Sequence, residues 1–313
     1  MYLIKYGTKD KNIDVTEIVY NNKKLIKSGI IHIPSGDGNR SQYFTDPVEG
    51  VLKSIFIVNN VNNVEEYDVT KNIYIDTIVN KIYTEDADVP EYIKELFPNV
   101  MEKLKNIHQK LKLDYGSFND ELPEQMMAVR YLTGKEKVLE LGGNIGRNSL
   151  VIAYILNQHE NSNFVSLECE PEIAEQLRHN HNINKLNFFI EPSALSKRKL
   201  IQKNWETFAN DIVLDGYKPV STINLDELYA KYNINFDTLV IDCEGAFYYI
   251  LMDMPEILKN VNLIIMENDY WNFSKKQYVD SILYYNRFYQ DYVEAGGWGP
   301  CYNNFFEVWK RDS

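Results

Sequence analysis

The stretch Val138-Leu-Glu-Leu-Gly-Gly-Asn-Ile-Gly146 decides the fold of this chain. An apolar run enters a glycine-rich turn and a helical pattern follows, which is typical of the first strand, turn and helix of a nucleotide-binding α/β domain. Glu168 ends the next apolar run and follows Gly146 by 22 positions (168 − 146). A carboxylate at about that distance accepts hydrogen bonds from ribose hydroxyls in such domains. The alternative that the motif leaves open is a purely structural strand-turn-helix unit.

The position of Glu140 beside this turn indicates the class of ligand. In a dinucleotide site the helix N-terminus holds a pyrophosphate, which a neighbouring carboxylate would repel. A ligand with an amino group suits the position better, and S-adenosylmethionine has an amine, a ribose and an adenine but no phosphate. Gly142 and Gly143 let the chain turn sharply and let backbone N–H groups approach a ligand.

Charge is unevenly distributed along the 313 residues, whose net charge is −12. Residues 1–115 carry 15 basic and 17 acidic side chains, and the remainder carries 18 basic and 28 acidic. An acidic C-terminal half is poorly suited to binding a phosphate backbone, because cationic contacts supply most of that affinity. A nucleic-acid partner is therefore disfavoured.

Three features of the sequence bear on the cellular compartment. The cysteines Cys169, Cys243 and Cys301 lie far apart and have no metal-finger spacing, so reduced thiols are expected. The first ten residues lack the apolar core of a signal peptide, and no apolar run approaches the length of a membrane span. We therefore expect a cytoplasmic protein without a membrane span.

The N-terminal part of the chain has the pattern of a small β domain. Residues 3–6, 30–33, 54–58 and 73–78 are β-branched or aromatic runs, and turn-forming residues separate them. No amphipathic helical pattern is evident between these runs. The prediction for residues 1–86 is an all-β, sandwich-like accessory domain, followed by a helical connector at 87–120.

From Lys137 onward, strand and helix patterns alternate. Alternation of this kind predicts an α/β fold with a mostly parallel twisted sheet and helices on both faces, here over residues 121–313. The predicted strands are 138–141, 164–167, 188–190, 238–241 and 263–266, with a closing antiparallel strand at 305–309. The predicted helices are 123–132, 148–158, 171–182, 225–232 and one that starts at 248.

Polar side chains follow the carboxyl ends of these strands, where ligands bind in such sheets. They are Glu140, Glu168, Ser193, Asp242, Glu244 and Glu267. In Asp242-Cys-Glu-Gly245 two carboxylates follow one strand; each could act as a general base for a hydroxyl, bind a cationic group of the cofactor, or bind a hard cation. Glu244 could instead cap the next helix. Glu267-Asn-Asp269 on the neighbouring strand leaves Mg²⁺ open as a weakly supported cofactor, and no metal ligand is assigned.

Aromatic residues form two clusters near the end of the chain. Tyr270, Trp271 and Phe273 directly follow the last parallel strand and could form the wall of a substrate site. The second cluster is Tyr284, Tyr285, Phe288 and Tyr289, for which packing of a long helical insertion is an equally good interpretation.

The C-terminal region, about residues 120–313, resembles the FkbM family of S-adenosylmethionine-dependent methyltransferases, which have a Rossmann-like class I fold. The matching segments occur in family order and are 138–146, 165–171, 193–196, 221–226, 239–246 and 264–267. Two positions depart from the family pattern. Glu140 stands where Asp is usual, which preserves the charge, and Phe247 replaces a carboxylate that often follows Gly245-Ala246.

The resemblance implies methyl transfer to an oxygen, often the hydroxyl of a sugar or a natural product, and the acceptor that we expect here is a carbohydrate or glycoconjugate hydroxyl. It implies that Glu140 and the glycine turn hold the methionine end of the cofactor and that Glu168 holds the ribose. The remaining turn residues are Gly142, Gly143, Asn144 and Gly146. Ser193 and Ala194 would border the adenine, and Asp242, Glu244 and Glu267 would face the transfer site as catalytic residues.

Two other functions remain open at this point. One is methylation of a nucleic acid or a protein, and the other is a catalytically silent cofactor-binding assembly module. A homo-oligomer is also compatible with the sequence.

Overall fold

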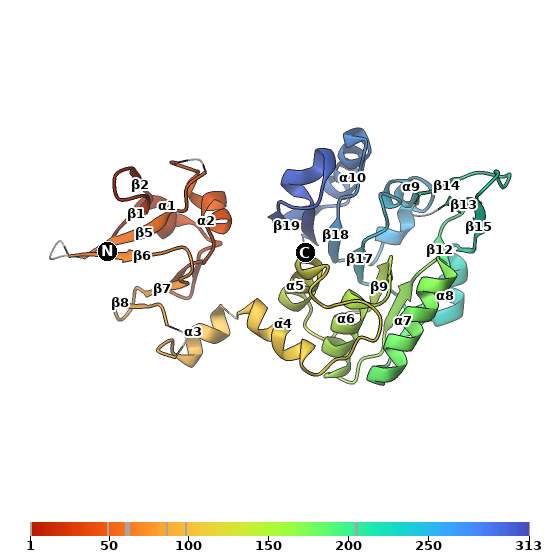
Figure 1. Cartoon of the computed structure of the whole chain (residues 1–313), viewed down its shortest axis with the longest axis horizontal. Coiled ribbons are helices and arrows are strands. Elements are labelled where there is room, and N and C mark those ends of the chain that lie inside the picture. The colour runs from red at the N-terminus through yellow and green to blue at the C-terminus, as the bar shows by residue number, and fades with distance from the viewer. Residues whose placement is uncertain are drawn as a thin grey trace. The chain divides into compact units, whose positions relative to one another are not determined.

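The computed structural model describes residues 2–48, 50–59, 63–85, 87–97, 99–203 and 206–312. The chain divides into two compact units, Met1–Asn99 and Val100–Ser313 (Figure 1). The division falls inside the predicted connector, and that connector is helical only in part. Helix α3 (Glu91–Leu96) lies in the first unit, and α4 (Val100–His108) lies in the second.

The first unit contains two four-stranded antiparallel sheets with the strand orders β2-β1-β5-β6 and β3-β4-β7-β8. One core lies between them, because Ile4 and Ile57 of the first sheet and Ile31 and Ile75 of the second belong to the same buried cluster. The strands are β1 (Leu3–Gly7), β2 (Asn12–Asp14), β3 (Ile26–Lys27), β4 (Ile30–Ile33), β5 (Ser54–Val58), β6 (Val64–Tyr67), β7 (Ile73–Asp76) and β8 (Lys81–Tyr83).

The prediction that this unit contains only β structure is wrong, because two helices connect its strands. They are α1 (Thr16–Asn21) and α2 (Asp37–Phe44). Neither is long enough to display a repeating apolar stripe. In α2, Phe44, at the last residue, and Arg40, one turn earlier, are buried. Arg40 donates from its guanidinium to the carbonyls of Pro34 and Lys71 at 2.9 and 2.7 Å. A buried arginine gives no apolar signal in the sequence.

A seven-stranded mixed sheet forms the centre of the second unit, in the order β11-β10-β9-β17-β18-β20-β19. The first five of these strands run parallel, and β20 pairs antiparallel with both β18 and β19. The strands are β9 (Val138–Leu141), β10 (Phe164–Leu167), β11 (Phe189–Glu191), β17 (Thr238–Ile241), β18 (Leu263–Glu267), β19 (Phe288–Glu294) and β20 (Phe306–Arg311). The predicted α/β architecture is confirmed for this unit.

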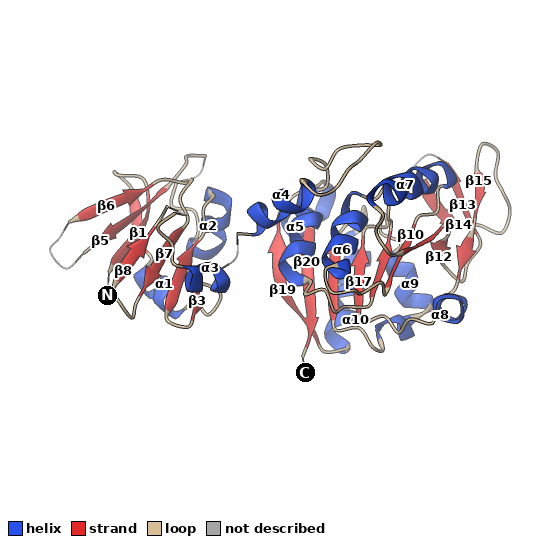
Figure 2. Cartoon of the chain, turned by 90° about the horizontal axis from the view of Figure 1, so that it is seen from below, coloured by secondary structure: helices blue, strands red, loops and turns tan. Residues whose placement is uncertain are grey.

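Helices cover both faces of this sheet. Figure 2 shows α5, α6 and α7 on one side and α8, α9 and α10 on the other. Their bounds are α5 (Leu122–Tyr131), α6 (Arg147–Asn157), α7 (Pro171–Asn184), α8 (Leu225–Tyr232), α9 (Phe247–Asp253) and α10 (Phe273–Tyr285). The parallel strands β9, β10 and β17 are buried along their whole length, as expected for strands with helices on both faces.

Two parts of the second unit differ from the expected pattern. Phe288 and Tyr289 belong to strand β19 and not to a helical insertion, because α10 ends at Tyr285. Between β11 and β17 the chain forms a short parallel pair, β12 (Ala194–Leu195) with β16 (Thr222–Ile223). It also forms a small antiparallel sheet of β13 (Leu200–Lys203), β14 (Glu206–Ala209) and β15 (Lys218–Val220).

Within the described residues, no helix combines the length and the apolar character needed to cross a bilayer.

Candidate functional site

Strand β9 lies at the point where the order of strands in the sheet reverses, with β10 on one side and β17 on the other. In open α/β sheets, ligands bind at the carboxyl ends of the strands next to this point. The predicted site residues of β9, β10, β17 and β18 therefore share one edge of the sheet, as the parallel pairings of these four strands require.

The glycine turn after β9 packs so closely that side chains would not fit. Gly142 has φ +93° and lies against the backbone of Asp242, where an added Cβ would meet the carbonyl oxygen at 1.6 Å. A Cβ on Gly143 would meet Ser166 Oγ at 2.2 Å, and one on Gly146 would meet Leu177 Cδ1 at 2.5 Å. The turn is therefore fixed between strand β17 on one side and strand β10 with helix α7 on the other.

Glu140 lies beneath this turn and not on its solvent side. Its carboxylate is only 2% exposed and accepts hydrogen bonds from the hydroxyl of Ser166 at 2.6 Å and from that of Ser149. Burial raises the pKa of Glu140 to about 7, although the two serine hydroxyls act in the opposite direction. The carboxyl group thus connects β9 to β10 and to the first turn of α6.

Glu168 lies at the tip of β10 and is half-buried. Its two carboxylate oxygens accept from the backbone N–H groups of Asn144 and Glu170, each at 2.8 Å. Burial raises the pKa of Glu168, and the backbone donors act against this shift. Asn144 has φ +46°, a conformation that asparagine tolerates better than most residues. The side chain of Glu168 therefore holds the glycine turn in place through the backbone N–H group of Asn144.

A loop at residues 109–121 crosses beside the turn and is tied to it by the fully buried Asn180 of α7. The Asn180 side-chain oxygen accepts from Asp114 N at 3.0 Å and Tyr115 N at 3.3 Å. Its amide donates to the carbonyls of Tyr115 and Ile145 at 3.2 and 2.9 Å. One side chain thus connects the loop, the turn and helix α7.

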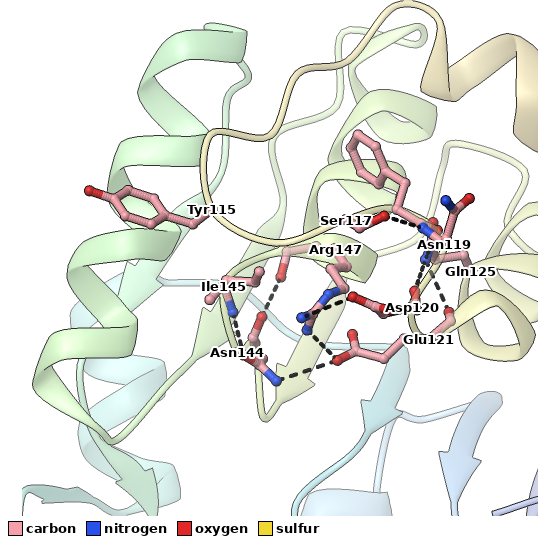
Figure 3. Close-up of polar contacts among 12 residues, drawn as sticks. Tyr115, Ser117, Asn119, Asp120, Glu121, Gln125, Asn144, Ile145 and Arg147 are labelled. Atoms are coloured by element: carbon pink, nitrogen blue, oxygen red, sulfur yellow. Dashed lines mark hydrogen bonds and ion pairs between the residues drawn. The ribbon is translucent and has the colours of Figure 1, made fainter.

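The end of the same loop places a carboxylate next to the turn. Glu121 accepts from Arg147 Nη1 at 2.6 Å and from Asn144 Nδ2 at 3.4 Å, as Figure 3 shows. Arg147 also pairs with Asp120 at 3.5 Å. Burial raises the pKa of Glu121, and Arg147 opposes this effect. Glu121 was not among the site residues predicted from the sequence.

The tips of β17 and β18 bring further carboxylates together. Asp242, Glu267 and Asp269 each offer an oxygen, and these oxygens lie within 4.8 Å of one another. Glu124 of α5, which is 7% exposed, approaches Glu267 closely enough for a hydrogen bond between the two carboxyl groups. We call these four residues the acidic cluster.

Hydrogen bonds within the acidic cluster join Glu267 to Glu124 and to Asp269, and they leave two oxygens of the cluster without a partner among the described residues. Glu124 Oε2 and Asp269 Oδ1 are buried without a hydrogen-bond partner there. Burial raises the pKa of Asp242 and of Glu267 well above the ordinary range, and the charges of neighbouring carboxylates raise both further. Burial and the charge of Glu244 raise the pKa of Asp269 to about 6. The cluster therefore disfavours full ionisation in the absence of a cation.

The other predicted site residues lie at the same edge in different surroundings. Glu244 is exposed and has φ +50°, and it does not cap helix α9, whose N-cap is Ala246. Ser193 is buried beyond the tip of β11 and donates to Glu191 at 2.9 Å. Ala194 begins β12, and its N–H group donates to Ser221 O at 2.9 Å.

Aromatic side chains lie close in sequence to the acidic cluster. Trp271, two positions after Asp269, is 82% exposed. Its ring centroid lies 4.3 Å from that of Trp298. The exposed Trp271, next to the half-buried Trp298 and close in sequence to these carboxylates, offers a surface on which a ring with hydroxyl groups could stack.

Residues 140–293 match the family described as the methyltransferase FkbM domain. No curated protein matches the chain.

Several solved structures are similar to the chain. A putative O-methyltransferase from Klebsiella pneumoniae is 13% identical, with a TM-score of 0.39, over 71% of this chain and 95% of that one. An O-methyltransferase from Bacillus cereus in complex with SAH is 16% identical, with a TM-score of 0.37, over 71% and 96%. A ribosomal protein L11 methylase from Lactobacillus delbrueckii subsp. bulgaricus is 14% identical, with a TM-score of 0.39, over 65% and 84%.

The family match covers strands β10, β11, β17 and β18 together with the glycine turn and most of the acidic cluster. The C-terminal region of the chain, residues 140–293, is therefore a methyltransferase FkbM domain.

Proposed function

We propose that the chain is an S-adenosylmethionine-dependent O-methyltransferase that acts on a hydroxyl group of a sugar or glycoconjugate. The observation that carries the proposal is the shared sheet edge of a methyltransferase FkbM domain, where a glycine turn adjoins buried carboxylates. S-adenosylmethionine supplies an electrophilic methyl group on a sulfonium ion. Its two positive charges, on the sulfonium and the amine, suit an edge this rich in carboxylates.

The β9 and β10 side of the edge is assigned to the cofactor. Glu168 uses part of its acceptor capacity on the N–H groups of Asn144 and Glu170 and retains lone pairs for ribose hydroxyls. Gly142, Gly143, Asn144 and Gly146 form the wall at the methionine end, and Ser193 and Ala194 border the adenine.

Glu140 and Glu121 are assigned different roles at the methionine end. Glu140 is buried against two serines and supports the turn from below. Glu121 reaches the same turn from the 109–121 loop and is better placed to contact the cofactor's amine directly. The residue proposed to contact the cofactor's amine is therefore Glu121, and not Glu140 as expected from the sequence.

The β17 and β18 side is assigned to the acceptor. The hydroxyl oxygen attacks the methyl carbon, a C–O bond forms, the C–S bond breaks, and its electron pair stays on sulfur. The proton of the hydroxyl passes to a carboxylate, for which Asp242, Glu244 and Glu267 are the candidates. The products are a methyl ether and S-adenosylhomocysteine, and holding the two reactants in line provides much of the rate.

A sugar acceptor is supported by the combination of side chains beside the acidic cluster. Carboxylates accept hydrogen bonds from hydroxyl groups, and the exposed Trp271 beside Trp298 offers a face for stacking. The acidic charge of residues 116–313 supports a sugar over a nucleic acid.

The test is a calorimetric titration of S-adenosylhomocysteine into the full-length protein. We expect micromolar binding to the wild type and at least tenfold weaker binding to Glu168→Ala, because this variant loses the ribose contact and the anchor of the turn. Glu172→Ala, which removes an exposed carboxylate from the start of α7, is the matched control and should bind like the wild type. Absence of binding to folded wild-type protein would overturn the proposed function.

The acceptor is then sought with a labelled methyl donor. Sugars and glycoconjugates, pooled RNA and peptides are offered separately, and label is expected in the first group. Trp271→Ala should raise the KM for a sugar acceptor with little change in cofactor affinity. Label in RNA or peptides alone would contradict the sugar assignment while leaving methyl transfer intact.

A further inference from the structure

Three carboxylates at the tips of β17 and β18 surround a single point. The oxygens offered by Asp242, Glu267 and Asp269 lie within 4.8 Å of one another. Ligands on opposite sides of one hard divalent cation are separated by about twice the metal–oxygen distance, which is roughly 4.2 Å for Mg²⁺ and up to about 5 Å for Ca²⁺. The spacing therefore fits three ligands of one ion.

Glu124 provides a second and independent observation. Its side chain belongs to α5, which precedes the glycine turn, and it is 93% buried with Oε2 lacking any hydrogen-bond partner among the described residues. It points at the cluster, because its carboxyl group lies within hydrogen-bonding reach of Glu267. Asp269 Oδ1, in a side chain that is equally buried, also lacks a partner there.

Buried oxygens without a donor are rare in folded proteins, and each costs roughly 1–3 kcal/mol. Two such oxygens within one cluster of carboxylates indicate that something positive or hydrogen-donating belongs there. The ion pairs of Arg147 are with Glu121 and Asp120, which lie outside the acidic cluster.

We propose that Asp242, Glu267 and Asp269 bind one hard divalent cation, Mg²⁺, Mn²⁺ or Ca²⁺. The carboxyl group of Glu124, which lies against that of Glu267, would be a further ligand or a hydrogen-bond partner of Glu267. Ligands that are all carboxylate oxygens suit Mg²⁺ and Mn²⁺ and do not suit metals that prefer sulfur or imidazole. The inference extends the proposed function, since the remaining coordination positions would take hydroxyl groups of the acceptor. A sugar with two neighbouring hydroxyls is the class of acceptor that such an ion would bind best.

The experiment is a titration of the full-length protein with Mn²⁺, followed by the loss of the free Mn²⁺ signal in electron paramagnetic resonance. We expect one Mn²⁺ per chain and competition by Mg²⁺. Asp269→Asn and Glu267→Gln should each weaken binding at least tenfold, and thermal melting establishes that each variant is folded. Asp226→Asn, which changes an exposed carboxylate on α8, is the matched control and should bind like the wild type.

Binding of S-adenosylhomocysteine is measured on the same samples so that the two proposals can fail separately. If the wild type binds S-adenosylhomocysteine but no Mn²⁺, the cation site is overturned, the cluster is neutralised by protons, and the methyltransferase proposal stands. If Mn²⁺ binds the wild type and both cluster variants equally, the ion lies elsewhere on the acidic surface and the proposal is also overturned. The cation site is supported only if the wild type binds Mn²⁺ and both cluster variants lose this binding.

Discussion

The edge of the sheet formed by the carboxyl ends of β9, β10, β17 and β18 has two halves, and both contain buried carboxylates. The halves differ in whether these carboxylates have hydrogen-bond donors. On the β9 and β10 half, Glu140 accepts from two serine hydroxyls and Glu168 accepts from two backbone N–H groups. On the β17 and β18 half, the carboxylates of the acidic cluster face one another, and two of their oxygens are buried without a donor among the described residues.

This difference indicates what each half can do without a ligand. Carboxylates with their own donors hold the backbone in one conformation, so the β9 and β10 half is organised in advance. Carboxylates that face one another are held in place at a cost, because like charges and missing hydrogen bonds oppose their ionisation. The β17 and β18 half gains most from a cation, a proton or a hydroxyl group.

The largest expected effect comes from Gly142→Ala, where the two halves meet. The new Cβ would lie 1.6 Å from the carbonyl oxygen of Asp242, and the residue would keep a φ of +93°. We expect the free energy of unfolding to fall by roughly 3–5 kcal/mol, because neither backbone segment can move without distorting the sheet. Urea denaturation measures the loss. Gly38→Ala, in open space within α2, is the control and should change little; equal effects would contradict this account.

A smaller effect, with a pH signature, is expected for Glu140→Gln. The pKa of Glu140 is about 7 in the native state and has an ordinary value of 4.5. Below pH 4.5 the carboxyl group is protonated in both states and its stabilising contribution is complete. As the pH rises through 7, the native state must ionise a buried group and that stability is lost, by roughly 3 kcal/mol at 1.36 kcal/mol per pKa unit.

The Glu140→Gln variant has no carboxyl group to ionise at this position, so it does not lose stability in this way as the pH rises. Urea denaturation at pH 5, 6, 7 and 8 should therefore show the stability of the wild type falling relative to Glu140→Gln by about 2.5 kcal/mol, because part of the loss lies below pH 5. Glu172→Gln, at an exposed position, should follow the wild type throughout. Parallel profiles for the wild type and Glu140→Gln would show that the buried carboxyl group titrates normally.

The smallest effect, and the one of opposite sign, is expected for Glu124→Gln. The amide keeps the shape of the side chain, removes one charge from the acidic cluster and can donate to Glu267. In metal-free buffer at pH 8 we expect the free energy of unfolding to rise by roughly 1 kcal/mol. Thermal and urea denaturation measure the change, with Asp226→Asn as the surface control. A clear loss of stability would mean that Glu124 has a favourable partner in the native protein.

Much of the second unit was predictable because its strands are unbroken apolar runs that end in polar residues. The bounds predicted for β9, β10, β17 and helix α8 agree with the structure. Strand β19 was not predicted, since its residues Phe288–Glu294 mix aromatic and charged side chains directly after a helix. In the first unit, α1 and α2 were missed because short helices without an apolar stripe resemble loops in a sequence.

The candidate site was predictable only where a residue follows a strand of the sheet. Asp242, Glu267 and Glu168 are identified in this way, because parallel strands bring their carboxyl ends to one edge. Glu121 and Glu124 were not, since they precede the first strand and reach the edge through the 109–121 loop and helix α5. Their placement depends on helix packing and on the contacts of Asn180, and no spacing rule in the sequence encodes these.

The close approach of Gly142 to the Asp242 carbonyl has a consequence for how two reactants would be aligned. The glycine turn and the tip of β17, which are the proposed donor and acceptor sides, approach each other through backbone atoms, so their separation is set by the sheet and not by side-chain rotamers. Substitutions at other residues around the carboxyl ends of the strands can then alter which acceptor binds. They would leave unchanged the distance over which a methyl group would be transferred. A rigid joint of this kind lets one catalytic geometry serve many acceptors.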